Sequence, residues 1–247
     1  MKVLVLFFLT FSCAWGKVIL IDPGHGGEES GAVGYFDVKK TRRVFEKDLC
    51  LRLAKKIKEQ ISKSETAFLT RSMDRAVGLQ ERADLADMVK ADLFLSIHFN
   101  SSTNNKSNGF ELYYLDNNSN VGANKVERAE NLNLKGEDLV INQILIDLVV
   151  QQTVTHSKDL ARAVHEKVRP VVKQHKMVDR GIKPGLFYVL ALSKRPGLLV
   201  EVGFVSNPNE LKKVNQEKFL DDMAKGISQG VLSYISQNKK EASKKPL

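Results

Sequence analysis

The chain has 247 residues, of which 43% are hydrophobic and 27% are charged. This is the composition of an ordinary globular protein, and a chain of this length buries a full core. A chain of this composition and length does not need disulfides or metals to fold, so a metal site here would serve catalysis and not folding.

The chain is basic, with a formal net charge of +9 and a pI near 9.4. Such a charge suits an anionic partner. Nucleic acid is the competing interpretation, but the basic residues are dispersed among acids, as in Lys55–Glu59, and no aromatic-rich nucleic-acid motif is present. We therefore expect no nucleic-acid partner.

The first sixteen residues have the layout of a secretory signal. A basic start precedes the apolar run Val3–Phe11, and Ala14 and Gly16 form a small-x-small pattern. The run is too short to span a bilayer as a mature helix, so we expect no membrane span. The alternative to a secretory signal is that this apolar run forms a buried first strand or helix. We expect cleavage after Gly16 and export to the periplasm or the extracellular space.

The predicted elements alternate along the chain. A buried strand at 17–22 is broken sharply by Pro23-Gly24-His25-Gly26-Gly27. In 46–61, apolar residues recur every four positions, which indicates one face of a helix. Further strands are predicted at 66–71, 92–99, 109–115 and 198–204, and further helices at 79–90, 155–173 and 217–235.

This alternation predicts an α/β fold in a single domain. We expect a mostly parallel, twisted sheet of about six strands with helices on both faces, in a catalytic domain at 17–237. The segment 117–152 interrupts the rhythm, with helix-like pieces at 121–132 and 138–152, and is interpreted as an insertion. The basic segment 238–247 is expected to be a disordered tail.

Two histidines stand where predicted strands end, and one acid interrupts a further predicted strand. His25 follows the first strand, and His98 ends the strand at 92–99. Ligands gather at the carboxyl ends of strands in open α/β sheets, so the two histidines are expected to meet. Glu201 interrupts an apolar run, where an acid is costly unless it is paired or lies next to a cation.

Two imidazoles and a carboxylate are a common ligand set for catalytic zinc, with one position left for water. Glu46 is the candidate third ligand, and Glu201 is the candidate general base and acid. From the residues alone, the roles of these two glutamates could be exchanged. The alternatives are a surface Glu46 that begins a helix and a buried Glu201 paired with Arg or Lys.

The sequence resembles the zinc-dependent N-acetylmuramoyl-L-alanine amidases, in the branch typified by bacterial cell-separation enzymes. The resemblance covers about residues 17–235 and keeps the order and rough spacing of the motifs. It is carried by the segments 18–27, 46–49, 96–98 and 200–207, supported by Thr70-Arg71 and Leu79–Arg82.

The resemblance implies that His25, Glu46 and His98 hold one Zn²⁺ and that Glu201 is the catalytic acid/base. The implied substrate is peptidoglycan, cut at the amide between N-acetylmuramic acid and L-alanine of the stem peptide. The chain departs from the family at Glu29-Ser30, at Arg42–Phe45, which lacks an expected glycine, and at Phe99. None of these departures falls on a predicted ligand, so they concern the shape of the substrate groove more than catalysis.

The insertion also resembles the regulatory helix of Gram-negative division amidases, in which an acid occupies the open position of the zinc. Glu130 is the candidate for this inhibitory ligand, with Glu127 second, and a protein activator would displace the helix. The alternative is that both are solvated surface acids. The segment 183–190 resembles a family segment near the site and is expected to help bind substrate.

Two other functions stay open at this point. One is a wall-binding module that has lost catalysis, and the other is a zinc carboxypeptidase that trims the stem peptide. His156, His165 and His175 are interpreted as ordinary surface or partly buried residues, and we expect a monomer.

Overall fold

The computed structural model describes residues 16–37, 39–117, 124–131 and 143–243. The predicted signal segment lies outside these residues except for Gly16. Six strands form one sheet in the order β4-β1-β5-β8-β6-β7. In the described part of the chain, no helix is both long and apolar enough to cross a membrane.

Four neighbouring strands run parallel, and the two at one edge run the other way. The parallel strands are β4 (Thr66–Leu69), β1 (Val18–Pro23), β5 (Leu93–His98) and β8 (Gly197–Glu201). The others are β6 (Phe110–Leu115), which is antiparallel to β8, and β7 (Asp179–Gly185), which is parallel to β6. The predicted mostly parallel six-stranded sheet is confirmed, and β1, β5 and β8 end at one edge.

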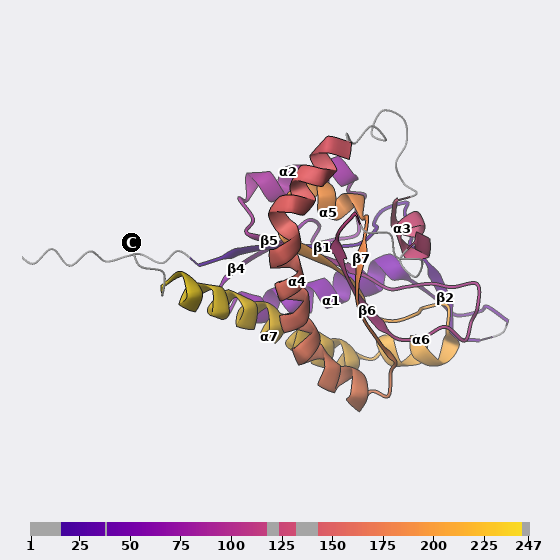
Figure 1. The fold of residues 1–247 in the computed structure, drawn as a ribbon. Coiled ribbons are helices and arrows are strands. Elements are labelled where there is room, and N and C mark those ends of the chain that lie inside the picture. The colour runs from indigo at the N-terminus through magenta and orange to yellow at the C-terminus, as the bar shows by residue number, and fades with distance from the viewer. Residues whose placement is uncertain (1–15, 38, 118–123, 132–142, 244–247) are drawn as a thin grey trace, which may run out of the picture.

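Helices cover both faces of the sheet, as Figure 1 shows. Alternate strand residues divide between two cores, so that Ile21 packs with the first set of helices and Leu20 with the second. The first set is α1 (Glu46–Ile61), α7 (Glu217–Ala242) and the later part of α4 (Gln143–Gln174), whose first turns pack in the second core through Ile146 and Val149. The second set is α2 (Leu79–Met88) and α5 (Tyr188–Ser193).

Smaller elements complete the fold. The strands β2 (Val33–Tyr35) and β3 (Arg43–Phe45) form a hairpin that leads directly into α1. The helix α3 (Asn124–Asn131) corresponds to the first predicted piece of the insertion, and α6 (Pro208–Val214) follows β8. The hairpin, β7, α5 and α6 were not among the predicted elements, because their apolar patterns are short.

The second predicted piece of the insertion is part of α4. The sequence predicted separate helices at 138–152 and 155–173, but one helix runs from Gln143 to Gln174. Ile146 and Val149 are buried, and the buried hydroxyl of Thr153 donates to the carbonyl of Val149 at 2.7 Å. This hydroxyl is satisfied within the helix, so the polar residues at the predicted break do not interrupt it.

The last helix extends beyond its predicted end at Ile235 and into the predicted disordered tail. Residues 238–242 belong to α7, whereas 244–247 lie outside the described residues. The ammonium of Lys239 lies 2.7 Å from the carboxylate of Glu65, which fixes the last turns to the body of the domain. Lysines in the last turn also favour the helix, because its carboxyl end carries partial negative charge.

Candidate active site

His25 lies in a tight loop after β1 and has a φ of 57°, which is rare for a residue with a side chain. Such strain persists only where surrounding contacts hold it. Arg71 donates to the carbonyl oxygens of Pro23 at 3.1 Å and Gly24 at 2.7 Å, and Arg82 donates to that of His25 at 3.1 Å. Two buried guanidinium groups therefore hold the loop.

Asp22 lies beneath this loop, and sequence analysis did not identify it. Its buried carboxylate accepts hydrogen bonds from Thr70 at 2.6 Å and Ser96 at 2.9 Å and forms an ion pair with Arg82. Burial raises the pKa of Asp22, but Arg82 and the Thr70 hydroxyl outweigh burial and hold this pKa below its usual value. A buried charged network thus supports the backbone that carries His25.

Glu46 is the first residue of α1, and His98 is the last residue of β5. The Glu46 carboxylate accepts hydrogen bonds from the backbone N–H groups of Ala32 at 2.8 Å and Phe99 at 3.0 Å. The backbone packs tightly here, because a Cβ on Gly24 would lie 2.4 Å from the His98 ring. Only glycine permits the loop after β1 to approach His98 so closely.

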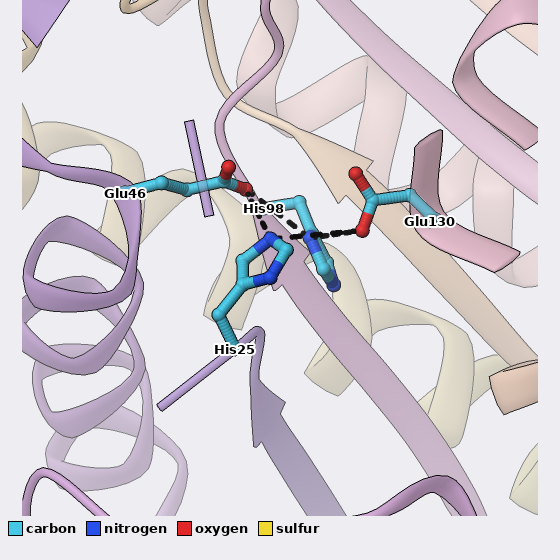
Figure 2. A group of neighbouring side chains, drawn as sticks. All are labelled: His25, Glu46, His98 and Glu130. Carbon is cyan, nitrogen blue, oxygen red and sulfur yellow. Dashed lines mark hydrogen bonds and ion pairs between the residues drawn. The ribbon is translucent and has the colours of Figure 1, made fainter. Parts of the chain in front are cut away.

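Four side chains from four segments converge at this edge of the sheet, as Figure 2 shows. His25, Glu46, His98 and Glu130 each offer one ligand atom, and these atoms all lie within 4.8 Å of one another. Glu46 Oε1 is 3.1 Å from His25 Nε2 and 3.2 Å from His98 Nδ1. Glu130 Oε2 is 2.8 Å from His98 Nδ1 and 3.7 Å from His25 Nε2.

The group is strongly coupled electrostatically. Burial lowers the pKa of His98, but the carboxylates of Glu130 and Glu46 outweigh burial and raise this pKa well above its usual range. Burial raises the pKa of Glu46, but the two imidazoles outweigh it and hold this pKa far below its usual value. The buried Glu46 and the partly buried Glu130 beside two imidazoles therefore favour a positive charge between them.

This donor set fits a metal ion. Two imidazole nitrogens and two carboxylate oxygens match the ligands and the number that zinc takes. His25 Nε2 is buried and makes no hydrogen bond, although buried ring nitrogens are normally paired. A metal would satisfy this nitrogen, and the group could hold one.

Glu201 ends β8, directly beside the metal-ligand group. In the sheet it pairs with His98 on β5 and with Glu111 on β6. Both of its carboxylate oxygens are buried without a hydrogen-bond partner. Burial, followed by the charges of Glu130, Glu46 and Glu111, raises its pKa well above the usual value.

Glu111 is a second buried acid that sequence analysis missed. It accepts a hydrogen bond from Lys183 at 2.9 Å and also contacts Arg180 and the hydroxyl of Tyr113. Lys183 thus lies near the site as expected, although its described partner is Glu111. An acid among apolar residues in 109–115 was the signal in the sequence, of the kind that identified Glu201.

The helix α3 brings Glu130 to the group and is anchored on the segment between β7 and α5. Glu127 accepts from the backbone N–H of Leu186 at 2.9 Å. Asn131 donates to the Leu186 carbonyl at 2.8 Å and accepts from the Tyr188 N–H at 3.1 Å. The structure therefore places Glu130 at the metal-ligand group and Glu127 at the anchor.

A hollow of about 420 Å³ adjoins the group under α3. Its walls include His25 and Glu46 on one side and Val126, Ala129 and Glu130 of α3 on the other. The remaining histidines lie elsewhere. The rings of His165 and His175 each lie 2.8 Å from an aspartate, and that of His156 lies 3.3 Å from the Tyr234 hydroxyl.

Comparison with known proteins gives a consistent result. A family model described as N-acetylmuramoyl-L-alanine amidase matches residues 19–233. The chain is 32% identical over 241 residues to the N-acetylmuramoyl-L-alanine amidase AmiA of Escherichia coli, covering 93% of this chain and 80% of that protein.

Solved structures show the same likeness. The catalytic domain of the amidase CwlV from Bacillus (Paenibacillus) polymyxa var. colistinus is 30% identical with a TM-score of 0.67, covering 89% of this chain and 98% of that one. The CwlD amidase from Clostridioides difficile, solved in complex with the GerS lipoprotein, is 25% identical with a TM-score of 0.66, covering 90% of this chain and 99% of that one.

Proposed function

This chain belongs to the family of N-acetylmuramoyl-L-alanine amidases, and on that premise we propose that it hydrolyses the amide between N-acetylmuramic acid and L-alanine in peptidoglycan. The observation that carries the proposal is the convergence of His25, Glu46, His98 and Glu130 beside Glu201, whose buried oxygens have no partner. Four ligand atoms and a free carboxylate are the parts of a metal-assisted hydrolase.

His25, Glu46 and His98 would hold one zinc ion. When bound, zinc supplies Lewis acidity that polarises a carbonyl and eases the ionisation of water. Glu46 is suited to the role of a ligand, because two backbone N–H groups fix its carboxylate and its pKa is low. These contacts around Glu46 favour Glu46 as the metal ligand and Glu201 as the acid/base.

Glu201 would move the proton during the reaction. As a general base its carboxylate takes a proton from the attacking water, and as a general acid it gives that proton to the leaving amine of L-alanine. Its raised pKa and lack of hydrogen-bond partners suit a group that must both accept and release a proton.

The test is hydrolysis of purified peptidoglycan with the products identified by mass. We expect zinc-dependent release of intact stem peptides and its loss in Glu201→Gln. The control Glu166→Gln makes the same change at an exposed position on α4 and should match the wild type. Trimmed peptides would instead indicate a carboxypeptidase. No release from the zinc-loaded wild type or from Glu130→Ala would contradict hydrolysis and favour a binding module.

Glu130 would act as an inhibitory fourth ligand. Its Oε2 lies 2.8 Å from His98 Nδ1, and as a ligand it would take a place that water or substrate would otherwise occupy. The Glu130→Ala variant should therefore hydrolyse peptidoglycan faster than the wild type at equal zinc content. A rate equal to or below that of the wild type in a folded variant would contradict inhibition.

A protein activator would relieve this inhibition by displacing α3. The related CwlD was solved in complex with a lipoprotein, which supports the general idea of a protein partner. Export to the periplasm or the extracellular space, following removal of residues 1–16, would bring the enzyme to its substrate. Mass measurement of the protein recovered outside the cytoplasm would test whether its first residue is Lys17.

A further inference from the structure

Very few buried polar side-chain atoms lack a hydrogen-bond partner in the described part of the chain. They are His25 Nε2, both carboxylate oxygens of Glu201 and the amide nitrogen of Asn100. Buried polar atoms are nearly always hydrogen-bonded, so each exception calls for an explanation. The proposed chemistry explains the first three atoms, and Asn100 Nδ2 remains.

Asn100 lies two residues beyond His98 and is 7% exposed. It lines the hollow of about 420 Å³ that His25, Glu46 and Glu130 also line. Its side chain therefore faces the space beside the metal-ligand group. The covering helix α3 supplies no hydrogen bond to its amide nitrogen.

The orientation of the carboxamide follows from its contacts. Asn100 Oδ1 accepts a hydrogen bond from the Ser101 N–H at 2.8 Å, so the other end of the group is the nitrogen. The backbone carbonyl of Asn100 accepts from the Val205 N–H at 2.9 Å. These two contacts fix the local fold, and neither of them uses Nδ2.

We infer that Asn100 Nδ2 binds the substrate by donating a hydrogen bond to one of its oxygen atoms in this hollow. The inference rests on the proposed function, which supplies a substrate rich in carbonyl and carboxylate oxygens. A neutral amide donor can hold either kind of oxygen. When α3 moves away, substrate enters the hollow and accepts the hydrogen bond from Asn100 Nδ2, to which α3 offers no acceptor.

The experiment measures kcat and KM on a soluble muramoyl peptide in the Glu130→Ala background. Asn100→Asp keeps an oxygen for the Ser101 N–H but removes the donor, and Asn100→Ala removes both groups without adding charge. The control Asn104→Asp makes the same change at an exposed asparagine whose Oδ1 also accepts a backbone N–H, that of Lys106. Zinc content and thermal unfolding are measured for every variant.

We expect both Asn100 variants to raise KM by roughly tenfold at unchanged zinc content, the size of one hydrogen bond, while Asn104→Asp stays at the parent value. Calorimetric binding of the same peptide to the double variant Glu130→Ala, Glu201→Gln should weaken equally when either Asn100 substitution is added. This second measurement does not depend on turnover.

Two results would overturn the inference. In the first, Asn100→Asp keeps the KM and the affinity of the parent, and Asn100→Ala loses only thermal stability. This result would show that Asn100 acts only through the hydrogen bond that its Oδ1 accepts. The other is a loss confined to Asn100→Asp, which would show an effect of the added charge. Peptide release by the parent enzyme, measured alongside, separates either result from a failure of the proposed function.

To find which part of the substrate the donor meets, the same variants are assayed on a muramoyl amide that lacks the residues after L-alanine. If the Asn100 variants no longer raise KM with the shorter substrate, the oxygen that accepts the hydrogen bond lies on the peptide. If they still raise KM, this oxygen lies on the muramoyl–alanine portion. Both results require a raised KM on the full substrate, and so both support the donor role.

Discussion

Three buried glutamates at the site differ in what surrounds their carboxylates. Glu46 is held by two backbone N–H groups and two imidazoles, and Glu111 by Lys183, Arg180 and a tyrosine hydroxyl. Glu201 has no hydrogen-bond partner, although it pairs with Glu111 across the sheet. The pKa of Glu46 is lowered and that of Glu201 is raised, and such a separation between neighbouring acids is typical of acid/base catalysis.

Asp22 provides a test of the network beneath His25. Both Asp22 and Arg82 are buried, and removing one partner of a buried ion pair leaves the other charge uncompensated. The Asp22→Asn variant should therefore lose about 3 kcal/mol of unfolding free energy at pH 7, measured by urea titration. The control Asp84→Asn alters an exposed acid on α2 and should change this free energy by less than about 0.5 kcal/mol.

The same pair predicts a pH dependence. The pKa of Asp22 is lowered in the folded state, so its contribution is fully present above the unfolded pKa of about 3.9. That contribution is lost as the pH falls through the lower folded pKa. The difference in unfolding free energy between the wild type and Asp22→Asn should thus shrink below about pH 4. A difference that stays constant from pH 7 to pH 3 would contradict the assignment.

The sequence predicted the elements with long, regular patterns and the residues in them. The helix at 46–61 has its predicted bounds, and the predicted strand ends bring His25 and His98 to one edge. The strand predicted at 198–204 ends earlier, at Glu201, which places this acid at the same edge. Asp22, Arg82 and Glu111 were not predicted as a group, because their role depends on pairing between segments distant in the chain. Asn100 was missed for the same reason, since its unpartnered nitrogen is a property of packing.

The short helix α3 depends on a few polar contacts. Its buried apolar contact is Val126, and Glu127 and Asn131 bond to the backbone of Leu186 and Tyr188. Glu130 adds the contact with the imidazoles. A helix of this length is unstable alone, so its place over the hollow depends on these anchors.

Asn131→Ala tests whether the anchors keep α3 closed. The change removes the hydrogen bonds to Leu186 and Tyr188, worth about 1 kcal/mol each, without touching Glu130. Basal peptidoglycan hydrolysis should rise several-fold, because the closed population falls. Arg128→Ala, at an exposed position on the same helix, is the matched control and should leave the rate unchanged. Equal rates for Asn131→Ala and Arg128→Ala would contradict a role of Asn131 in keeping α3 closed.

At the scale of the whole molecule, the metal-ligand group joins four segments that are distant from one another in the chain. His25 follows β1, Glu46 begins α1, His98 ends β5 and Glu130 belongs to α3. The two hydrophobic cores on either side of the sheet are complete without these residues. Folding should therefore survive loss of the metal, whereas the site edge should become less stable.

Metal removal separates these two contributions. A ligand that binds only the folded state adds about 4 kcal/mol at a thousandfold excess over its Kd, and in a domain of this size 1 kcal/mol shifts Tm by about 2–4 °C. Chelation should therefore lower Tm by roughly 10 °C while unfolding stays cooperative, and added zinc should restore it. Glu201→Gln should keep this response, because Glu201 is not a proposed ligand, and His25→Ala should lose most of it. A wild-type Tm that is the same with chelator and with zinc would contradict metal binding at this group, whatever the hydrolysis assay shows.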